Sequence, residues 1–269
     1  MQNNLLGLPS FVRHLAYNRS VRAIVRAVGL SWIARKVYCF LTPGITLNST
    51  GVSANLVTSA DCNIELLDFV VDAEKDLLHE VLRRLEPTDV FWDVGAQWGI
   101  YAIPAAKLAR RAVAFEPFPA SNATLRLNVE RNHISNIMIF DFALSDQNGE
   151  VYLLHAENTC PTVSEKGDLA VEAARGDDLI AAGSVPAPTV IKVDVEGHEF
   201  AVLKGICHAL SSSSCHLVAC EIHPQLLPQG VTKETIVSLL CDCGLAVVSE
   251  FHRGPEFQII AARKTVQST

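Results

Sequence analysis

Residues 91–100 read FWDVGAQWGI. The apolar run Val90–Val94 leads directly into Gly95, and Gly99 follows just before a predicted helix over 101–110. A strand, a glycine turn and a helix in this order form the place where α/β sheets bind nucleotides. Gly95 allows a sharp turn and close approach of a ligand, while Gly99 allows close packing of the helix on the strand. The spacing D-x-G-x-x-x-G is not the G-x-G-x-x-G of NAD enzymes, which argues against an NAD-dependent dehydrogenase.

Short apolar runs alternate with helical patterns along the rest of the chain. The runs cover 90–94, 112–115, 137–140, 190–193, 216–222, 245–249 and 257–262, and helices are predicted over 73–85, 101–110, 121–132, 199–210 and 233–243. This alternation is typical of a mostly parallel sheet with helices on both faces. A turn at 253–255 joins the last two runs and predicts a C-terminal antiparallel hairpin. We therefore expect an α/β fold with a seven-stranded sheet, and residues 155–188 as a lid or substrate loop.

Charge is distributed unevenly along the 269 residues, whose net charge is −7. All 29 acidic residues follow residue 60, together with 16 of the 22 basic ones. Residues 21–36 have an amphipathic helical pattern with most of the basic side chains on one face. Such a helix either docks on the domain or lies on an anionic membrane surface. We expect residues 1–60 to form a basic helical extension and connector, and residues 61–269 to form the main domain.

The composition also bears on location and partners. No apolar run in the first forty residues is long enough to span a membrane, and arginines interrupt each candidate signal-peptide core. The 8 cysteines lack the regular spacing of a disulfide framework and suit a reducing compartment. We expect a cytoplasmic protein, with peripheral membrane contact through the N-terminal helix as an alternative. The acidic main domain has no base-stacking motif, so a nucleic-acid partner is not expected.

Two acidic positions near the ends of the second and third runs suit a nucleoside. Glu116 ends the run 112–115, 21 residues after Gly95, where a carboxylate can accept both ribose hydroxyls. Asp141 and Ala143 follow the third run, at the position where an adenine ring would lie.

The stretch VIKVDVEGHE, residues 190–199, is the most specific one. It brings Asp194, Glu196, His198 and Glu199 to the carboxyl end of a buried strand, where open α/β sheets place their sites. Negative charge at a helix N-terminus explains Glu196 and Glu199 equally well. The next strand ends in ACEIHP, and alternation puts Glu221 and His223 on the same side of it.

Taken in order, these motifs resemble the FkbM-type methyltransferase family. The resemblance covers about residues 85–249 and is carried by DVGAQWG, AFEPFPASNATLRLNVERN, FALSDQNG, IKVDVEGHE with LKG, and EIHP. It implies a Rossmann-like class I methyltransferase fold, S-adenosylmethionine as methyl donor, and O-methylation of a hydroxyl on a small sugar, glycolipid or polyketide-like acceptor. The donor-binding residues expected are Asp93, Gly95, Ala96, Gln97, Gly99, Glu116, Asp141 and Ala143. Asp194 matches the site acid at the end of the fourth strand.

Methyl transfer requires alignment of the acceptor oxygen with the methyl group, and the hydroxyl must lose its proton. Histidine has an ordinary pKa of about 6.5, so we predict His198 or His223 as proton acceptor, with Asp194 and Glu221 orienting it. A divalent metal held by Asp194, Glu221 and His223 is a second route.

The alternative is a non-catalytic scaffold attached to a membrane by the basic helix. Gln97 and Trp98 support it, because the family has asparagine and an aliphatic residue at these positions. Donor binding distinguishes the scaffold from the enzyme.

Overall fold

A computed structural model describes residues 45–57, 74–154, 161–164 and 166–263. The basic helix predicted over 21–36, and with it the choice between docking and membrane contact, lies outside the described residues. Within the described ranges, no helix is long and apolar enough to cross a membrane.

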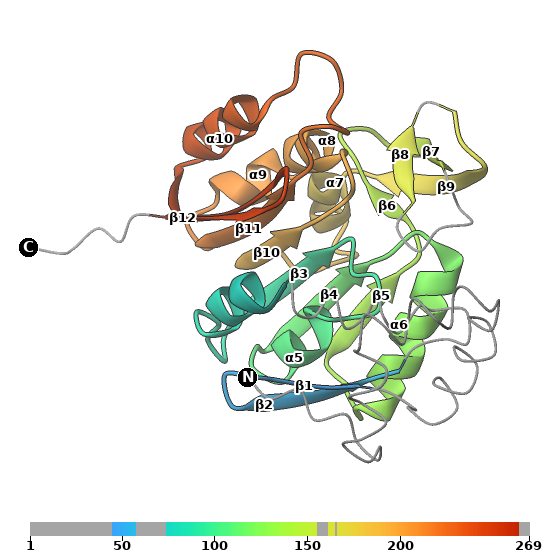
Figure 1. The fold of residues 1–269 in the computed structure, drawn as a ribbon, viewed down its shortest axis with the longest axis vertical. Coiled ribbons are helices and arrows are strands. Elements are labelled where there is room, and N and C mark those ends of the chain that lie inside the picture. The colour runs from blue at the N-terminus through green and yellow to red at the C-terminus, as the bar shows by residue number, and fades with distance from the viewer. Residues whose placement is uncertain (1–44, 58–73, 155–160, 165, 264–269) are drawn as a thin grey trace, which may run out of the picture.

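Seven strands form the central sheet (Figure 1), which confirms the fold predicted from the sequence. Their order is β12-β13-β11-β10-β3-β4-β5. The strands are β3 (Val90–Val94), β4 (Arg111–Phe115), β5 (Ile137–Phe140), β10 (Val190–Val193), β11 (Leu217–Ile222), β12 (Leu245–Arg253) and β13 (Glu256–Arg263). The first five are mutually parallel, and β13 runs antiparallel between β11 and β12. The carboxyl ends of β3, β4, β10 and β11 therefore meet at one edge of the sheet.

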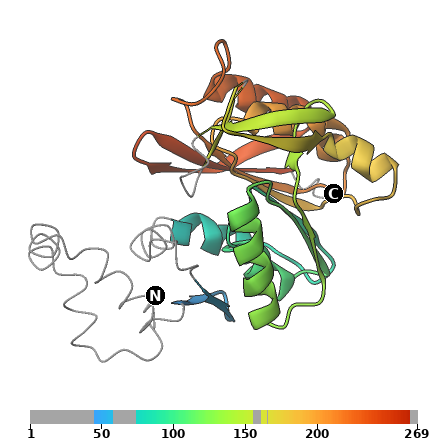
Figure 2. The same ribbon diagram turned by 90° about the vertical axis from the view of Figure 1, so that its right-hand side faces the viewer.

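Helices cover both faces of this sheet, as Figures 1 and 2 show from two directions. One face carries α7 (Gly176–Ala181), α8 (Glu199–Gly205), α9 (Cys207–Ser211) and α10 (Lys233–Asp242), and the other carries a helix over 74–82, α5 (Ala102–Ala106) and α6 (Pro119–Arg131). Successive strand residues point to opposite faces, so Phe91 packs with Leu77 on one face while Trp92 packs with Leu203 on the other. All four side chains are fully buried, which makes β3 the centre of two apolar cores.

The helix predicted over 199–210 is instead two helices that meet at Ile206. Gly205 lies so close to the loop after β6 that a Cβ would be 1.9 Å from the Ser145 carbonyl oxygen. Asp177 accepts hydrogen bonds from the backbone N–H groups of His208 and Ala209 at 2.9 and 3.0 Å. These tertiary contacts end α8 and begin α9. They involve residues remote in sequence, so the local helical pattern does not predict them.

A hairpin of β1 (Ile45–Ser49) and β2 (Val52–Leu56) packs beside α5 and α6. The side-chain oxygen of Asn128 accepts a hydrogen bond from Val57 N–H at 2.7 Å, and Asn132 accepts one from Asn55 N–H at 2.8 Å. This part of the predicted N-terminal extension is therefore attached to the main domain.

The region predicted as a long loop, residues 155–188, contains two strands and a helix among its described residues, and the two strands join two earlier ones in a sheet. A small sheet combines β6 (Ala143–Leu144), β7 (Gly149–Leu154), β8 (Thr162–Ser164) and β9 (Leu169–Ala174) in the order β6-β9-β7-β8, and α7 follows it. Side chains from three of these strands line the pocket described below. The small sheet therefore forms one wall of the candidate site.

Candidate active site

The turn after β3 has an unusual backbone because three of its residues have positive φ. These are Gly95 at 80°, Gln97 at 48° and Gly99 at 88°. A Cβ on Gly95 would lie 1.8 Å from the carbonyl oxygen of Asp194, so only glycine lets the end of β3 approach the end of β10 this closely. A Cβ on Gly99 would lie 2.7 Å from Leu125 Cδ1 of α6. Gly99 therefore permits close helix packing, and Gly95 brings the turn to the neighbouring strand end.

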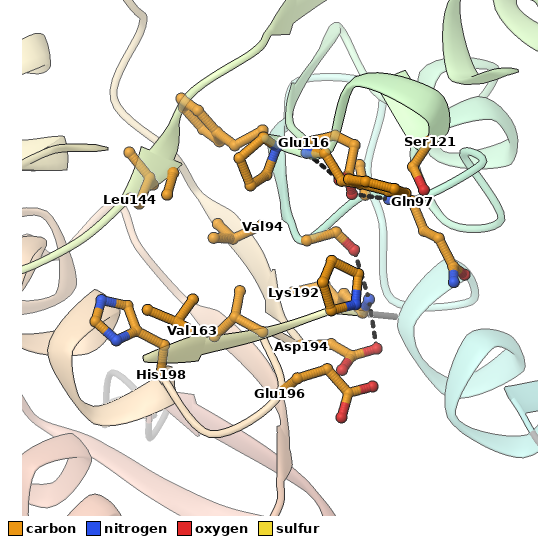
Figure 3. Close-up of a pocket in the computed structure, with 18 of the residues that line it drawn as sticks. Val94, Gln97, Glu116, Ser121, Leu144, Val163, Lys192, Asp194, Glu196 and His198 are labelled. Carbon is orange, nitrogen blue, oxygen red and sulfur yellow. Dashed lines mark hydrogen bonds and ion pairs between the residues drawn. The ribbon is translucent and has the colours of Figure 1, made fainter. Parts of the chain in front are cut away.

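Glu116 follows β4 and ties this turn to the next loop (Figure 3). Its carboxylate accepts hydrogen bonds from Gln97 N–H at 2.7 Å and Phe118 N–H at 2.9 Å. The side chain is buried, and burial raises the pKa of Glu116 to about 7 although the two N–H groups oppose this shift. Each carboxylate oxygen still has lone-pair capacity for a further donor.

Asp93 lies behind the turn and supports it. The buried Oδ2 accepts a hydrogen bond from Ala102 N–H at 2.8 Å at the start of α5, and Oδ1 lies 3.8 Å from Lys192 Nζ. Burial raises the pKa of Asp93 to about 6, against the effect of the nearby ammonium group. Its contacts with Ala102 and Lys192 therefore position the turn after β3.

A single pocket extends from the turn to the end of β10 (Figure 3). Five of the predicted donor-binding residues and two of the predicted catalytic residues line it: Gly95, Ala96, Gln97, Glu116, Ala143, Asp194 and His198. Of the described residues predicted for donor binding, Asp93, Gly99 and Asp141 do not line it, and Asp141 is exposed on the surface. Trp98, the bulky departure from the family pattern, is buried in the core with Phe91 and likewise does not line the pocket.

Lys192 is a buried cation in the middle of an apolar strand. Its ammonium lies 3.1 Å from Asp194 Oδ2 and 3.5 Å from the Gly95 carbonyl oxygen, and it sits above the Tyr101 ring at 4.8 Å from the centroid. Burial opposes the charge, but the surrounding carboxylates outweigh it and raise the pKa of Lys192. The same ammonium, together with His223, lowers the pKa of Asp194 against the effect of burial. Lys192 and Asp194 are therefore both charged, and they join the ends of β3 and β10.

His223 is buried beside three carboxylates. Its Nδ1 lies 2.7 Å from Glu199 Oε1, while Nε2 faces Glu196 Oε2 at 3.6 Å and Asp194 Oδ1 at 3.9 Å. Burial lowers the pKa of His223, but the hydrogen bond to Glu199 and the carboxylates outweigh it and raise the pKa to about 10. Burial and the neighbouring Asp194 raise the pKa of Glu196 to about 7.

Glu221 belongs to an ion-pair network centred on Arg253. It is fully buried, and its Oε1 pairs with Arg253 Nη2 at 2.8 Å while Oε2 accepts a hydrogen bond from Gln258 at 3.2 Å. Arg253 also pairs with Glu74, which accepts a hydrogen bond from Tyr101 at 2.6 Å. Burial, with Asp194 and Glu74, raises the pKa of Glu221 to about 9. Glu221 was predicted to orient a catalytic histidine, but among the described residues its hydrogen-bond and ion-pair partners are Gln258 and Arg253.

His198 lies on another part of the pocket wall, toward Leu144 and Val163 in Figure 3. One ring nitrogen, Nε2, lies 3.0 Å from Ser145 Oγ. Burial lowers the pKa of His198, and the negative charges of Asp146 and Glu199 only partly oppose this shift. The imidazole is therefore neutral at physiological pH, in contrast to that of His223.

Comparison with known proteins identifies the family. A family model described as "Methyltransferase FkbM domain" matches residues 93–245, more than half of the chain. This chain belongs to the FkbM methyltransferase family. It is a methyltransferase whose donor is S-adenosylmethionine, and the resemblance drawn from its motifs is confirmed.

This FkbM methyltransferase is similar to two named enzymes. It is 33% identical over 232 residues to hexuronic acid methyltransferase AglP of Haloferax volcanii, covering 85% of this chain and 92% of that protein. It is 29% identical over 223 residues to the 31-O-demethyl-FK506 methyltransferase FkbM of Streptomyces tacrolimicus, covering 68% of this chain and 83% of that protein. Among solved structures, FkbM from Methylobacillus flagellatus KT matches with a TM-score of 0.48 and 20% identity, over 73% of this chain and 52% of that one.

Four charged residues that line the pocket of this FkbM methyltransferase were not predicted as catalytic or donor-binding residues, namely Glu74, Lys192, Glu196 and Arg253. Lys192 could have been predicted from the sequence, because a lysine inside the apolar run VIKV requires an anionic partner. Glu196 belongs to the quoted VDVEGHE motif, but its position at a helix start had an equally good explanation in helix-dipole charge. Glu74 and Arg253 lie 179 positions apart and meet only in the folded chain.

Proposed function

We propose that this FkbM methyltransferase transfers a methyl group to a hydroxyl of a small sugar or polyketide-like acceptor. The names of the two relatives support these acceptor classes, and the longer and more identical match favours a hexuronic acid residue as the first to test. The observation that carries the proposal is a pocket with two different walls. One wall suits the methyl donor, and the other has titratable side chains that can orient the acceptor hydroxyl and take its proton. Gln97 and Glu116 line the first wall, and Asp194, Glu196 and His198 line the second.

The donor wall suits S-adenosylmethionine on its own geometry. Glu116 offers a buried carboxylate with remaining acceptor capacity beside the glycine turn, which is what two ribose hydroxyls require. Ala143 and Leu144 add apolar surface next to it, suited to the base. When bound, the donor supplies a sulfonium methyl group that the acceptor oxygen takes as the carbon–sulfur bond breaks, which leaves a thioether.

The chain's own task is then to orient the acceptor oxygen and to take its proton. We assign the proton to His198, because this side chain lines the pocket and the partner that faces its Nε2 is the hydroxyl of Ser145. His223 is less suited, because it lies behind the wall and is held by Glu199. Lys192 fixes Asp194, so that carboxylate serves to orient the acceptor rather than to accept its proton.

The test uses His198→Gln, with the exposed His208→Gln as matched control. S-adenosylmethionine affinity is measured by calorimetry, and methyl transfer is measured with a labelled donor on hexuronic acid glycosides and on O-demethylated macrolides. We expect His198→Gln to lower kcat by about 10²–10⁴-fold with unchanged donor affinity, since this is the usual contribution of a general base. An unchanged kcat in His198→Gln excludes His198 as the proton acceptor. Donor binding without transfer to any hydroxyl, alongside transfer to an amine or carbon acceptor, excludes the O-methylation.

A further inference from the structure

Three side chains at the ends of β10 and β11 point their ligand-type atoms at a common point. The atoms offered by Asp194, Glu196 and His223 all lie within 4.8 Å of one another. One oxygen of Asp194 is taken by Lys192, which leaves Oδ1 facing the imidazole. Glu196 has positive φ, 50°, and its partly exposed carboxylate lines the pocket. The group is therefore reachable from the pocket although His223 itself is buried.

The Nε2 atom of the His223 imidazole faces two carboxylates only at ion-pair distance. The His223 side chain is 3% exposed, and among the described residues its Nε2 has no hydrogen-bond partner. The nearest carboxylate oxygens, at 3.6 and 3.9 Å, are beyond hydrogen-bond distance. A buried N–H group without a hydrogen bond costs free energy, so ion pairs at these distances satisfy Nε2 only in part.

Glu199 fixes the orientation of this imidazole. Its Oε1 faces His223 Nδ1 at 2.7 Å and accepts a second hydrogen bond from Gly197 N–H at 2.9 Å. A carboxylate on Nδ1 fixes the ring so that Nε2 points at the two other carboxylates, and metal-ligating histidines almost always have such a partner. A cation bound at Nε2 would displace the proton that the imidazolium carries there. Glu199 is fully buried, so it cannot reach a ligand in the pocket and acts on the ring alone.

We propose that Asp194 Oδ1, Glu196 Oε2 and His223 Nε2 form a divalent-cation site on the acceptor wall of the pocket. Two carboxylates with one imidazole suit Mn²⁺ or Zn²⁺ better than Mg²⁺, because imidazole is a poor ligand for Mg²⁺. At metal–ligand distances of about 2.1 Å, ligand atoms in a tetrahedral arrangement are about 3.4 Å apart. The observed 3.6 and 3.9 Å therefore need only a small contraction on binding.

A neighbouring group, Glu221, His223 and Glu256, also has ligand atoms within 4.8 Å of one another. Both of its carboxylates are already paired with Arg253, at 2.8 Å for Glu221 and 2.6 Å for Glu256. A guanidinium between two carboxylates occupies the place that a cation would take. The metal route predicted from the sequence thus keeps Asp194 and His223 but replaces Glu221 with Glu196.

The role of the cation rests on the proposed function. A cation on this wall would coordinate the acceptor oxygen and polarise its O–H bond. The proton passes to His198, and the oxygen forms its bond to the methyl carbon as the carbon–sulfur bond breaks. No further reactant is required.

The site is tested with Mn²⁺ alone on the EDTA-treated full chain, by calorimetry and by the loss of the free-Mn²⁺ electron-spin signal. We expect saturable binding of one Mn²⁺ per chain, weakened at least tenfold in Glu196→Gln and His223→Gln. Glu199→Gln should weaken it about 10–100-fold, as is usual for a partner of a ligating histidine. Glu130→Gln on the surface of α6 and Glu256→Gln in the neighbouring group should leave it unchanged.

Absence of saturable Mn²⁺ and Zn²⁺ binding in the wild-type chain overturns the proposal, as does unchanged Mn²⁺ affinity in Glu196→Gln. Because Glu196 is partly exposed, its variant decides the matter if His223→Gln fails to fold. Titration of S-adenosylmethionine into the same sample separates the two proposals. Donor binding and hydroxyl methylation without Mn²⁺ binding remove only the cation site, and Mn²⁺ binding without hydroxyl methylation removes only the proposed reaction.

Discussion

Replacing Gly95 with alanine separates two reasons why this position needs glycine. The first reason is backbone conformation, because φ is 80°. The second is space, because the new Cβ would lie 1.8 Å from the Asp194 carbonyl oxygen. Gly51 provides a matched control, since its φ is 82° and a Cβ there meets nothing within 4 Å. The difference between Gly95→Ala and Gly51→Ala therefore reports the steric contact alone.

The magnitudes follow from these two features. A left-handed backbone costs an L-residue about 1–2 kcal/mol, and this should be nearly the whole effect of Gly51→Ala. Contacts below 3.0 Å are essentially never found for a Cβ, so Gly95→Ala must push the end of β10 away by roughly 1.2 Å. Overpacking of this kind typically adds about 1–3 kcal/mol. At about 2–4 °C per kcal/mol, the melting temperature should fall by about 2–8 °C in Gly51→Ala and by roughly 4–20 °C in Gly95→Ala.

The assay is chemical and thermal unfolding of both variants without ligand, followed by S-adenosylmethionine titration at a temperature where both are folded. Displacement of the Gly95 turn should weaken donor binding in Gly95→Ala only, because this turn lines the donor side of the pocket. Equal destabilisation of the two variants, with equal donor affinity, would refute the reasoning that Gly95 is required by the approach of β3 to β10.

Two further positions give quantitative expectations. Lys192→Met should destabilise the fold by about 3–5 kcal/mol in urea unfolding, because it leaves the buried Asp93 and the partly buried Asp194 without their cation. Combining Lys192→Met with Asp194→Asn should recover part of this loss. Glu116→Gln should weaken S-adenosylmethionine binding at least tenfold by calorimetry, whereas the exposed Glu150→Gln should not change it. The pKa of Glu116 is raised from 4.5 to about 7 on folding, so the native chain binds more protons and its stability falls as pH rises through this window. Unfolding without ligand at pH 4.5 and 7.5 should show that Glu116→Gln removes about 3 kcal/mol of this fall, and an unchanged pH dependence would contradict the raised pKa.

Much of the fold could be predicted because local sequence encodes it. Period-two and continuous apolar runs predicted all seven strands of the central sheet, and all of these strands except β12 begin and end within one residue of the prediction. The hairpin of β12 and β13 followed from the turn at 253–255, although β12 extends to Arg253 because its outer half continues to pair with β13. Apolar patterns of this kind depend on the strand's own residues, so a strand can be predicted without knowing which strands pair with it.

The helices were less predictable at their ends. The pattern over 199–210 is continuous, yet Asp177 caps a new helix in its middle from 31 positions away. The segment over 101–110 forms only the five-residue α5, which is followed by turns. Helix boundaries depend on which side chain satisfies the terminal N–H and carbonyl groups, and that side chain is often remote in sequence.

The sequence by itself determined the strand and helix order, the glycine turn, and the acids at the strand ends, because each follows from residues within one short segment. Only the tertiary structure decided which of these groups meet. It put Lys192 between Asp93 and Asp194, paired Glu221 with Arg253, and left His223 facing Glu196. The physical reason is that ion pairs and ligand sets form across strands whose neighbours are set by sheet order. That order is fixed by the packing of the whole domain rather than by any one segment.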